Sequence, residues 1–142
     1  MYIQPKLRER VNKLLNSEKN MGDALGITFT SFKTDEIKAT MPVNENSIQP
    51  FGLLHGGASV ALSETLASIG AWLNIQEEGK TAVGVEINAN HVRPVRKGGS
   101  VMGISIPIHI GRQTQLWETK IYTNKDKLVC VSRCTLAIVN EL

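Results

Sequence analysis

The sequence has few cysteines and no apolar leader at its start. Its two cysteines, Cys130 and Cys134, lie four residues apart in a stretch with strand-like alternation, which places their Cα atoms about 13 Å apart. This distance excludes a disulfide between them, and we expect both to be small buried residues of a protein in a reducing compartment. Residues 1–10 lack the apolar segment of a secretory signal, so we expect a cytoplasmic location.

The chain also lacks a strong excess of charge. It has 16 Lys and Arg against 13 Asp and Glu, a formal net charge of +3, which is far below the clustered excess of dedicated nucleic-acid binders. Nucleic acid is therefore not an expected partner, whereas an anionic small molecule is compatible with this charge. The length of 142 residues fits one domain, 1–142, with residues 1–20 as an N-terminal helical extension. A domain of this size has little volume for an enclosed cavity, so we expect a site that is shallow or shared between chains.

Hydrophobic periodicity predicts a short list of elements. Residues 6–18 place Val11, Leu14 and Leu15 at helical spacing, which predicts an amphipathic helix with these three side chains facing the body. Residues 37–43 alternate between apolar and polar side chains and predict a half-buried strand. Four further strands are predicted over residues 83–87, 102–110, 117–121 and 128–138.

Residues 56–73 form the longest apolar segment of the chain. Polar side chains interrupt it at Ser59, Ser63, Glu64, Thr65 and Ser68. These interruptions exclude a membrane span and favour a helix buried within the protein. Its many Ala, Ser and Gly residues would let it lie close to a sheet or to a second copy of itself. One buried helix among antiparallel strands predicts an α+β layer architecture.

Glu64 is the only charged residue of the predicted helix. An ionised carboxylate without partners is costly to bury, so Glu64 is a candidate general base or nucleophile, although a satisfied buried carboxyl or an interface salt bridge remains an alternative. The segment 55–57 precedes the helix, and free backbone N–H groups at a helix start can stabilise an anion or oxyanion. Ser68 lies four residues beyond Glu64 on the same face, and Gln49 places an amide donor on the approaching loop.

Other chemistries fit the residues poorly. The segment 57–61 resembles a nucleophile elbow only in part, and the chain is too short for the usual serine-hydrolase sheet. The three histidines and Glu64 match no metal-ligand spacing. The basic run 93–97 is either a solvated hairpin or a phosphate clamp.

Two segments resemble a known family. Residues 49–58, QPFGLLHGGA, followed by Glu64, resemble the hotdog-fold acyl-CoA thioesterases, in which a catalytic glutamate lies on the central helix. Residues 84–93, GVEINANHVR, resemble the dihydroxynaphthoyl-CoA thioesterases of menaquinone synthesis. The resemblance runs from about Met21 to the C-terminus. It implies a hotdog fold, in which a five- to six-stranded antiparallel sheet wraps a long helix, here with an added N-terminal helix.

The resemblance also implies roles for individual residues. Glu64 would be the nucleophile or general base, the Gly56 N–H would polarise the thioester carbonyl, and Ser68 would hold the attacking water. Gln49 and His55 would position the thioester. The coenzyme A path would be lined by Gly84, His91, Val92, Arg93, Pro94, Ile108, His109, Ile110, Gly111, Arg112 and Gln113. We expect no metal and no redox cofactor, with coenzyme A only as part of the substrate.

The spacing of two of these residues has a geometric consequence. Gly56 and Glu64 are eight residues apart, which along one helix is about 12 Å, and about 8 Å would remain with the glutamate side chain leaning toward the N-terminus. The two groups cannot both reach one carbonyl. If both act, Gly56 of one chain must meet Glu64 of another across two antiparallel helices, which predicts a homodimer with shared sites. We expect such dimers to pair into tetramers.

These arguments lead to one hypothesis and three alternatives. The hypothesis is a thioesterase that hydrolyses an aromatic acyl-CoA, such as 1,4-dihydroxy-2-naphthoyl-CoA or a hydroxybenzoyl-CoA, with Glu64 as nucleophile or general base. Arg112 directly after Gly111 is closer to the broader aryl-thioesterase pattern, so the acyl group stays open. The alternatives are a proofreading thioesterase acting on a carrier protein, a hotdog dehydratase, and a non-catalytic acyl-CoA-binding module.

Overall fold

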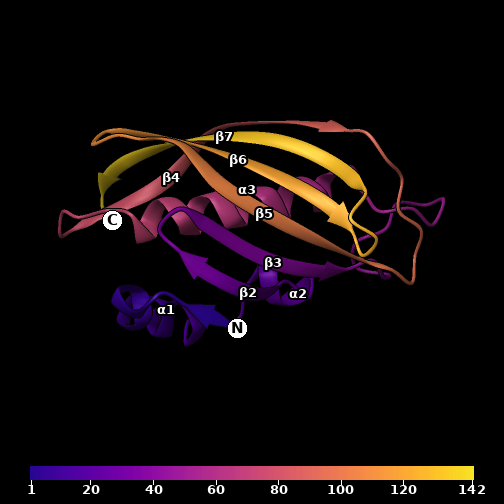
Figure 1. Ribbon diagram of the computed structural model, residues 1–142, viewed down its shortest axis with the longest axis horizontal. Helices are drawn as coiled ribbons and strands as arrows, with labels where there is room; N and C mark the ends of the chain where they lie inside the picture. Colours follow the sequence, from indigo (N-terminus) through magenta and orange to yellow (C-terminus); the bar gives the residue numbers. More distant parts are fainter.

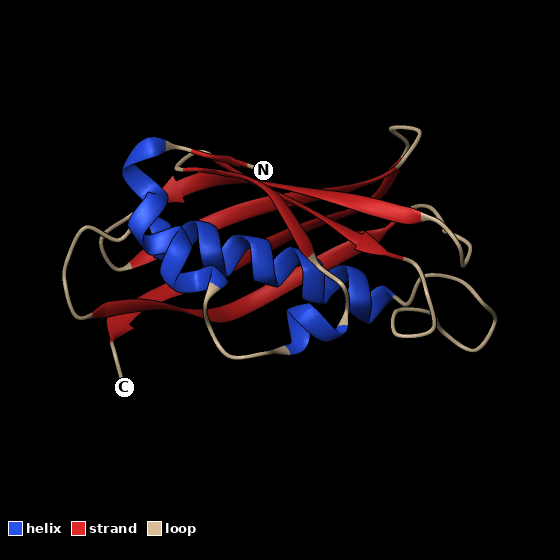
Figure 2. Ribbon diagram, turned by 90° about the horizontal axis from the view of Figure 1, so that it is seen from below, coloured by secondary structure: helices blue, strands red, loops and turns tan.

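One long helix, α3 (Gly56–Leu73), is wrapped by a curved seven-stranded sheet in the computed structural model, which describes residues 1–142 (Figures 1 and 2). The strands are β1 (Tyr2–Ile3), β2 (Thr28–Lys33), β3 (Glu36–Pro42), β4 (Lys80–His91), β5 (Ser100–Ile110), β6 (Thr114–Thr123) and β7 (Leu128–Asn140). Their order across the sheet is β1-β2-β3-β5-β6-β7-β4, and every neighbouring pair is antiparallel except β1 and β2. The predicted hotdog arrangement is confirmed.

The number of strands exceeds the five to six that were predicted. The two additional strands, β1 and β2, lie together at one edge of the sheet. A register shift between Phe29 and Ser31 breaks the alternation of β2, and β1 has only two residues. Neither strand therefore carries the period-two pattern on which the prediction depended.

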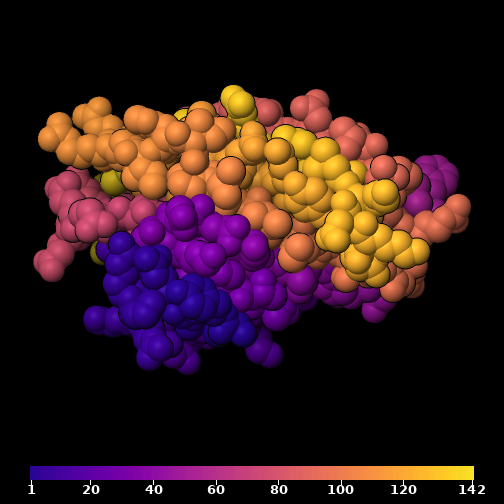
Figure 3. Space-filling view, in the orientation of Figure 1, coloured from indigo at the N-terminus to yellow at the C-terminus, as the bar shows by residue number.

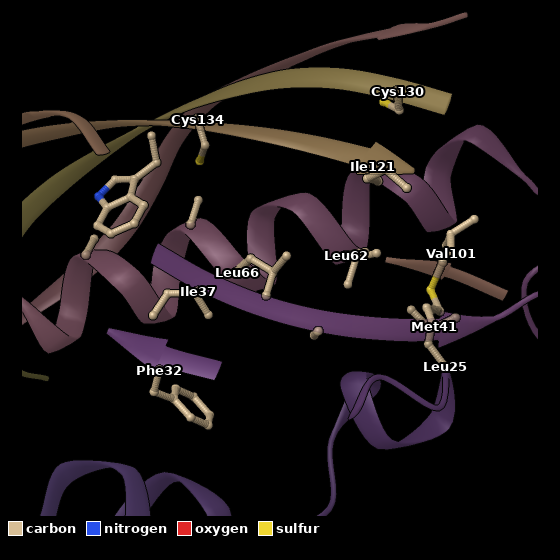
Figure 4. Close-up of a cluster of buried hydrophobic side chains, with 14 of the residues drawn as sticks. Leu25, Phe32, Ile37, Met41, Leu62, Leu66, Val101, Ile121, Cys130 and Cys134 are labelled. Carbon is tan, nitrogen blue, oxygen red and sulfur yellow. The ribbon is translucent and has the colours of Figure 1, made fainter. Parts of the chain in front are cut away.

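The core lies between α3 and the concave face of the sheet. In β3, Ile37, Ala39 and Met41 are fully buried while their neighbours are half-buried, as the alternation predicted. Leu62 and Leu66 of α3 are also fully buried and project toward β3 (Figure 4). Burying each such side chain contributes about 1.5–3 kcal/mol, so the apolar contacts of α3 hold the helix in the sheet.

Small residues let α3 approach the sheet closely. A Cβ atom added at Gly70 would lie 2.6 Å from the ring of Trp117 on β6, and one added at Gly103 on β5 would lie 2.6 Å from Leu66. A side chain at either position would displace its neighbour, because the packing leaves no free volume. The Gly- and Ala-rich composition of the helix thus sets its distance from β5 and β6.

The N-terminal segment differs from the predicted helix over residues 6–18. A 3₁₀ turn at Pro5–Leu7 precedes α1 (Arg8–Leu15), and the segment packs beside β2 and β3 (Figure 3). Val11 is fully buried and Leu14 half-buried, but Leu15 is exposed. The predicted inward orientation of Leu15 is therefore wrong, because a helix of two turns buries only one stripe of its surface.

A second short helix, α2 (Met21–Ala24), was missed. Its start is fixed by Asn20, whose side chain accepts a hydrogen bond from the Gly22 N–H, and by Asp23, which accepts one from the Asn20 N–H. This reciprocal cap was readable in the sequence as Asn followed three residues later by Asp.

Both cysteines are free and buried, as predicted. None of the helices combines the length and the apolar character that a bilayer crossing requires.

Candidate active site

The N-terminus of α3 presents a free backbone donor. His55 caps the helix from an extended conformation (φ −69°, ψ 131°), and its Nδ1 accepts a hydrogen bond of 2.8 Å from the Gly57 N–H. The Gly56 N–H, one residue earlier, donates to no group of the chain because the first N–H groups of a helix have no partner within it. This N–H is available to an acceptor outside the protein.

Two side chains beside this N–H keep their own donors free. The Nδ1 of His55 accepts from Gly57, so in the neutral ring Nε2 carries the hydrogen. The Oε1 of Gln49 accepts from the N–H groups of Phe51 and Leu53 across a tight turn, which leaves the amide NH₂ of Gln49 unused. The hydrogen bonds within this segment thus occupy the acceptor atoms of Gln49 and His55. Their N–H donors stay free, as a site that binds a carbonyl oxygen requires.

A surface depression of about 430 Å³ joins this helix end to the end of β4. Of the predicted site residues, it is lined by Gln49, Gly56, His91, Val92, Arg93 and Pro94. The imidazole of His91 lies against Gly56, where an added Cβ would stand 2.9 Å from its Nε2. Sequence analysis missed the lining residues Leu53, Leu54, Ser59 and Val129. Their contribution depends on how β7 and the loop before α3 pack, which no local pattern reveals.

Arg93 is the one Lys or Arg residue that lines this depression. Its Nε donates a hydrogen bond of 3.2 Å to the Leu128 carbonyl, which ties the side chain to the start of β7. The remaining guanidinium N–H groups of the exposed Arg93 are free for an anionic group.

Glu64 lies two helical turns further along α3, on a half-buried face of the helix. Its carboxylate rests directly against Gly84 of β4, because a Cβ atom at Gly84 would overlap Oε1. Ser68 follows one turn later on the same half-buried face. The absence of a side chain at Gly84 thus gives the carboxylate its place at an exposed strand.

The neighbouring thiol is not a candidate nucleophile. Burial raises the pKa of Cys134 to about 11, and the carboxylates of Glu64 and Glu86 add to this increase. Since the thiolate is the reactive form, Cys134 is protonated and inert near neutral pH. The structure also gathers no cluster of three or more His, Cys, Asp or Glu side chains that could hold a metal ion.

The remaining predicted residues, 108–113, lie at the opposite end of the molecule. The turn between β5 and β6 is closed by a hydrogen bond from the Gly111 N–H to the Thr114 carbonyl. Ile110, Gly111 and Arg112 border a depression shared with Asn74, which ends α3. One chain therefore does not bring residues 108–113 together with residues 91–94, because the two groups lie at opposite ends of the same helix.

The edge strand β4 has an unpaired side next to Glu64. It is 12 residues long and pairs only with β7. Val83 and Val85, on either side of Gly84, are 41% and 65% exposed. A long unpaired strand edge with exposed apolar side chains is a site at which another chain can pair.

The chain is similar in sequence to known thioesterases. The family model of the thioesterase superfamily matches residues 51–130, a range that includes Gly56, Glu64 and Arg93. The 1,4-dihydroxy-2-naphthoyl-CoA hydrolase of Escherichia coli is 48% identical over 122 residues, 86% of this chain and 88% of that protein. The proofreading thioesterase EntH of Klebsiella pneumoniae is 47% identical over 124 residues, 87% and 89% of the two chains.

A solved structure shows the same fold. The crystal structure of a thioesterase from Haemophilus influenzae superposes with a TM-score of 0.83 at 49% sequence identity, and the match covers 93% of this chain and 90% of that chain. Sequence and structure lead to one conclusion: the chain belongs to the thioesterase superfamily and is an enzyme with the hotdog fold.

Proposed function

We propose that this enzyme hydrolyses an aromatic acyl-CoA to the free acid and coenzyme A, with Glu64 as the reacting carboxylate. The observation that carries the proposal is the placement of Glu64, the one charged residue of α3, against the bare backbone of Gly84. A carboxylate held at an exposed edge, with a hydroxyl one turn away at Ser68, is suited to activate water or to attack a carbonyl.

The donors and the carboxylate act together only across two chains. Gly56 and Glu64 are eight residues apart in an unbroken helix, which corresponds to about 12 Å along its axis. A second copy pairing through the exposed edge of β4 would lay its α3 antiparallel to the first. That symmetry brings Gly56 of one chain to Glu64 of the other. It also brings residues 108–113 of one chain toward residues 91–94 of the other.

Hydrolysis then follows from the groups on the two sides of this interface. The thioester carbonyl oxygen accepts from the Gly56 N–H and from the free donors of Gln49 and His55, which stabilise the oxyanion as the carbonyl carbon becomes tetrahedral. Glu64 either takes a proton from the attacking water, positioned by Ser68, or attacks the carbon itself and forms an anhydride that water cleaves. In both routes the C–S bond breaks, water supplies the hydroxyl of the acid, and a proton reaches the thiolate.

Coenzyme A would lie along the depression that contains Arg93. The free guanidinium N–H groups of Arg93 suit a phosphate, and His91 and Pro94 line the same depression. The opposite wall would come from Ile108, His109, Ile110, Gly111, Arg112 and Gln113 of the second chain.

The acyl group we favour is aromatic. One relative bears the name 1,4-dihydroxy-2-naphthoyl-CoA hydrolase and another the name proofreading thioesterase. Dihydroxynaphthoyl-CoA, and with it a place in menaquinone synthesis, is therefore our first candidate. Hydroxybenzoyl-CoA and aroyl carrier-protein thioesters follow. Two buried free thiols suit a cytoplasmic enzyme, and we propose that its dimers associate further into tetramers.

A panel of thioesters tests the substrate class. Thiol release should be measured with benzoyl-, 4-hydroxybenzoyl-, 1,4-dihydroxy-2-naphthoyl- and decanoyl-CoA, and with a benzoyl carrier-protein conjugate. We expect the aromatic CoA esters to give kcat/KM at least about tenfold above decanoyl-CoA, since pocket complementarity discriminates by such factors. A preference for the carrier-protein conjugate would move the proposal to a proofreading thioesterase. Hydration of crotonyl-CoA without thiol release would replace it by a dehydratase.

The contact between Gly84 and Glu64 gives a prediction of its own. In Gly84→Ala the added methyl group would occupy the position of Oε1, so the carboxylate must move. We expect kcat to fall by about a hundredfold, because displacing a reacting group by about 1 Å has effects of this size. Asn88→Ala, on the same strand but remote from Glu64, is the matched control. Full activity of Gly84→Ala would show that the carboxylate does not act from this position.

A further inference from the structure

An apolar groove runs along α3 beyond the Glu64 carboxylate. It has a volume of about 330 Å³ and is lined by Leu14, Ser17, Ser68, Ile69, Trp72 and Ala82. Ser68 lies one helical turn from Glu64 and Trp72 two turns. The groove thus lies along the C-terminal half of α3, and Ser68 is its lining residue nearest to Glu64 along the helix.

The N-terminal segment forms one wall of this groove. Leu14 and Ser17 come from α1 and its end, while Ala82 comes from β4. Figure 2 shows α1 beside the C-terminal end of α3, with β4 on the other side of that helix. Leu14 is half-buried, and it lines both this groove and a neighbouring depression that also contains Ser17 and Ile69.

Arg10 fixes the far end of the groove. Its Nη1 donates hydrogen bonds of 2.9 Å to the Trp72 carbonyl and 3.3 Å to the Leu73 carbonyl, which caps the last turn of α3. The guanidinium also lies 5.4 Å from the centre of the Trp72 ring, a cation–π distance. With Val11 fully buried beneath it, α1 is attached firmly enough to serve as a rigid wall.

We propose that Leu14 determines which acyl groups the enzyme accepts, because α1 closes the acyl groove at Leu14 and Trp72. This inference rests on the proposed thioesterase function. It assigns substrate selection to a segment outside residues 51–130, the range that the family model matches.

The acyl group is the occupant that the groove fits. When the thioester carbonyl lies beside Glu64, the acyl group and the coenzyme A portion must extend from it in different directions. The phosphates of coenzyme A would lie near Arg93. The groove presents apolar side chains and small hydroxyls, with Lys13 as its only cation at the exposed rim. Its length is limited by Trp72, eight residues from Glu64 and so about 12 Å along the helix, which suits compact rings rather than long alkyl chains.

Two opposite substitutions at Leu14 test the inference. Leu14→Ala enlarges the groove at the α1 wall, and Leu14→Phe fills part of it. We expect Leu14→Ala to raise the kcat/KM ratio of 4-biphenylcarbonyl-CoA to benzoyl-CoA by about tenfold. We expect Leu14→Phe to lower the ratio of 2-naphthoyl-CoA to benzoyl-CoA by about tenfold, as for changes of a few methylene groups in an apolar pocket. A purely structural role of Leu14 would lower all rates together and leave these ratios unchanged.

Leu15→Ala is the matched control, since Leu15 is the adjacent leucine of α1, is exposed and does not line the groove. Circular dichroism and the melting temperature report whether each variant folds. Unchanged acyl ratios in both Leu14 variants, with an active wild type, would overturn the inference and leave the thioesterase function intact. A wild type that releases no thiol from any of these esters would instead overturn the proposed function.

Discussion

Replacing Glu64 by alanine or glutamine is expected to lower kcat by about a thousandfold or more, with KM changed little. The carboxylate is the only charged group of α3, so no other side chain of the helix can replace it as base or nucleophile. General bases and nucleophiles of enzymes contribute effects of this size. Glu64→Gln preserves the shape of the side chain against Gly84 and therefore separates the loss of charge from the loss of packing.

Thiol release at saturating benzoyl-CoA measures the effect, and equilibrium binding of the intact substrate to Glu64→Gln shows that the site still forms. Glu86→Gln is the matched control, because Glu86 is an exposed carboxylate on β4 that receives hydrogen bonds only from Asn88. Turnover by Glu64→Gln at the wild-type rate would remove Glu64 from the mechanism and leave the reaction without its central group.

Mixing two inactive variants is expected to restore activity. Gly56→Pro removes the backbone N–H that would polarise the carbonyl. Proline is well tolerated at the first position of a helix, and the extended backbone of His55 suits a following proline. We expect a loss of about 10²–10³ in kcat, as for other single oxyanion donors. Gly56→Ala is the matched control, since it adds a Cβ near His91 but keeps the N–H.

When Gly56→Pro chains are unfolded and refolded together with Glu64→Ala chains in equal amounts, half of the dimers are mixed. Each mixed dimer contains one site with neither substitution and one with both, so about a quarter of the wild-type activity should return. Differently tagged chains allow the mixed dimer to be isolated and counted. If the isolated mixed dimer is as inactive as its parents, the two groups do not act across an interface.

The central helix could be predicted from the sequence to within a residue, but the contacts of Glu64 could not. Residues 56–73 are apolar and rich in small side chains, and both of these signals are local. The contact between Glu64 and Gly84 depends on the position of β4 beside α3, including the register shift between Gly84 and Glu86. The position of β4 beside α3 is determined by packing between elements that are far apart in the sequence. No pattern within either segment predicts it.

The orientations of Gln49 and Leu15 could not be predicted from the sequence either. Gln49 was recognisable as an amide near the helix start, but its free NH₂ follows from the turn in which Phe51 and Leu53 occupy its oxygen. Leu15 was placed inward because it lies at helical spacing from Val11, whereas the short α1 turns it outward. Residue types were thus readable from the sequence, and their orientations required the fold.

The unpaired edge of β4 has a consequence for the newly synthesised chain. A single chain carries this strand edge unpaired, with Val83 and Val85 exposed, and unpaired edges are sites of aggregation. The same edge borders Gly84 and the Glu64 carboxylate, so the pairing that protects the chain from aggregation is also the pairing that would complete its site. If the proposed dimer forms, unassembled chains would therefore be exposed to chaperones and proteases before they could hydrolyse a thioester.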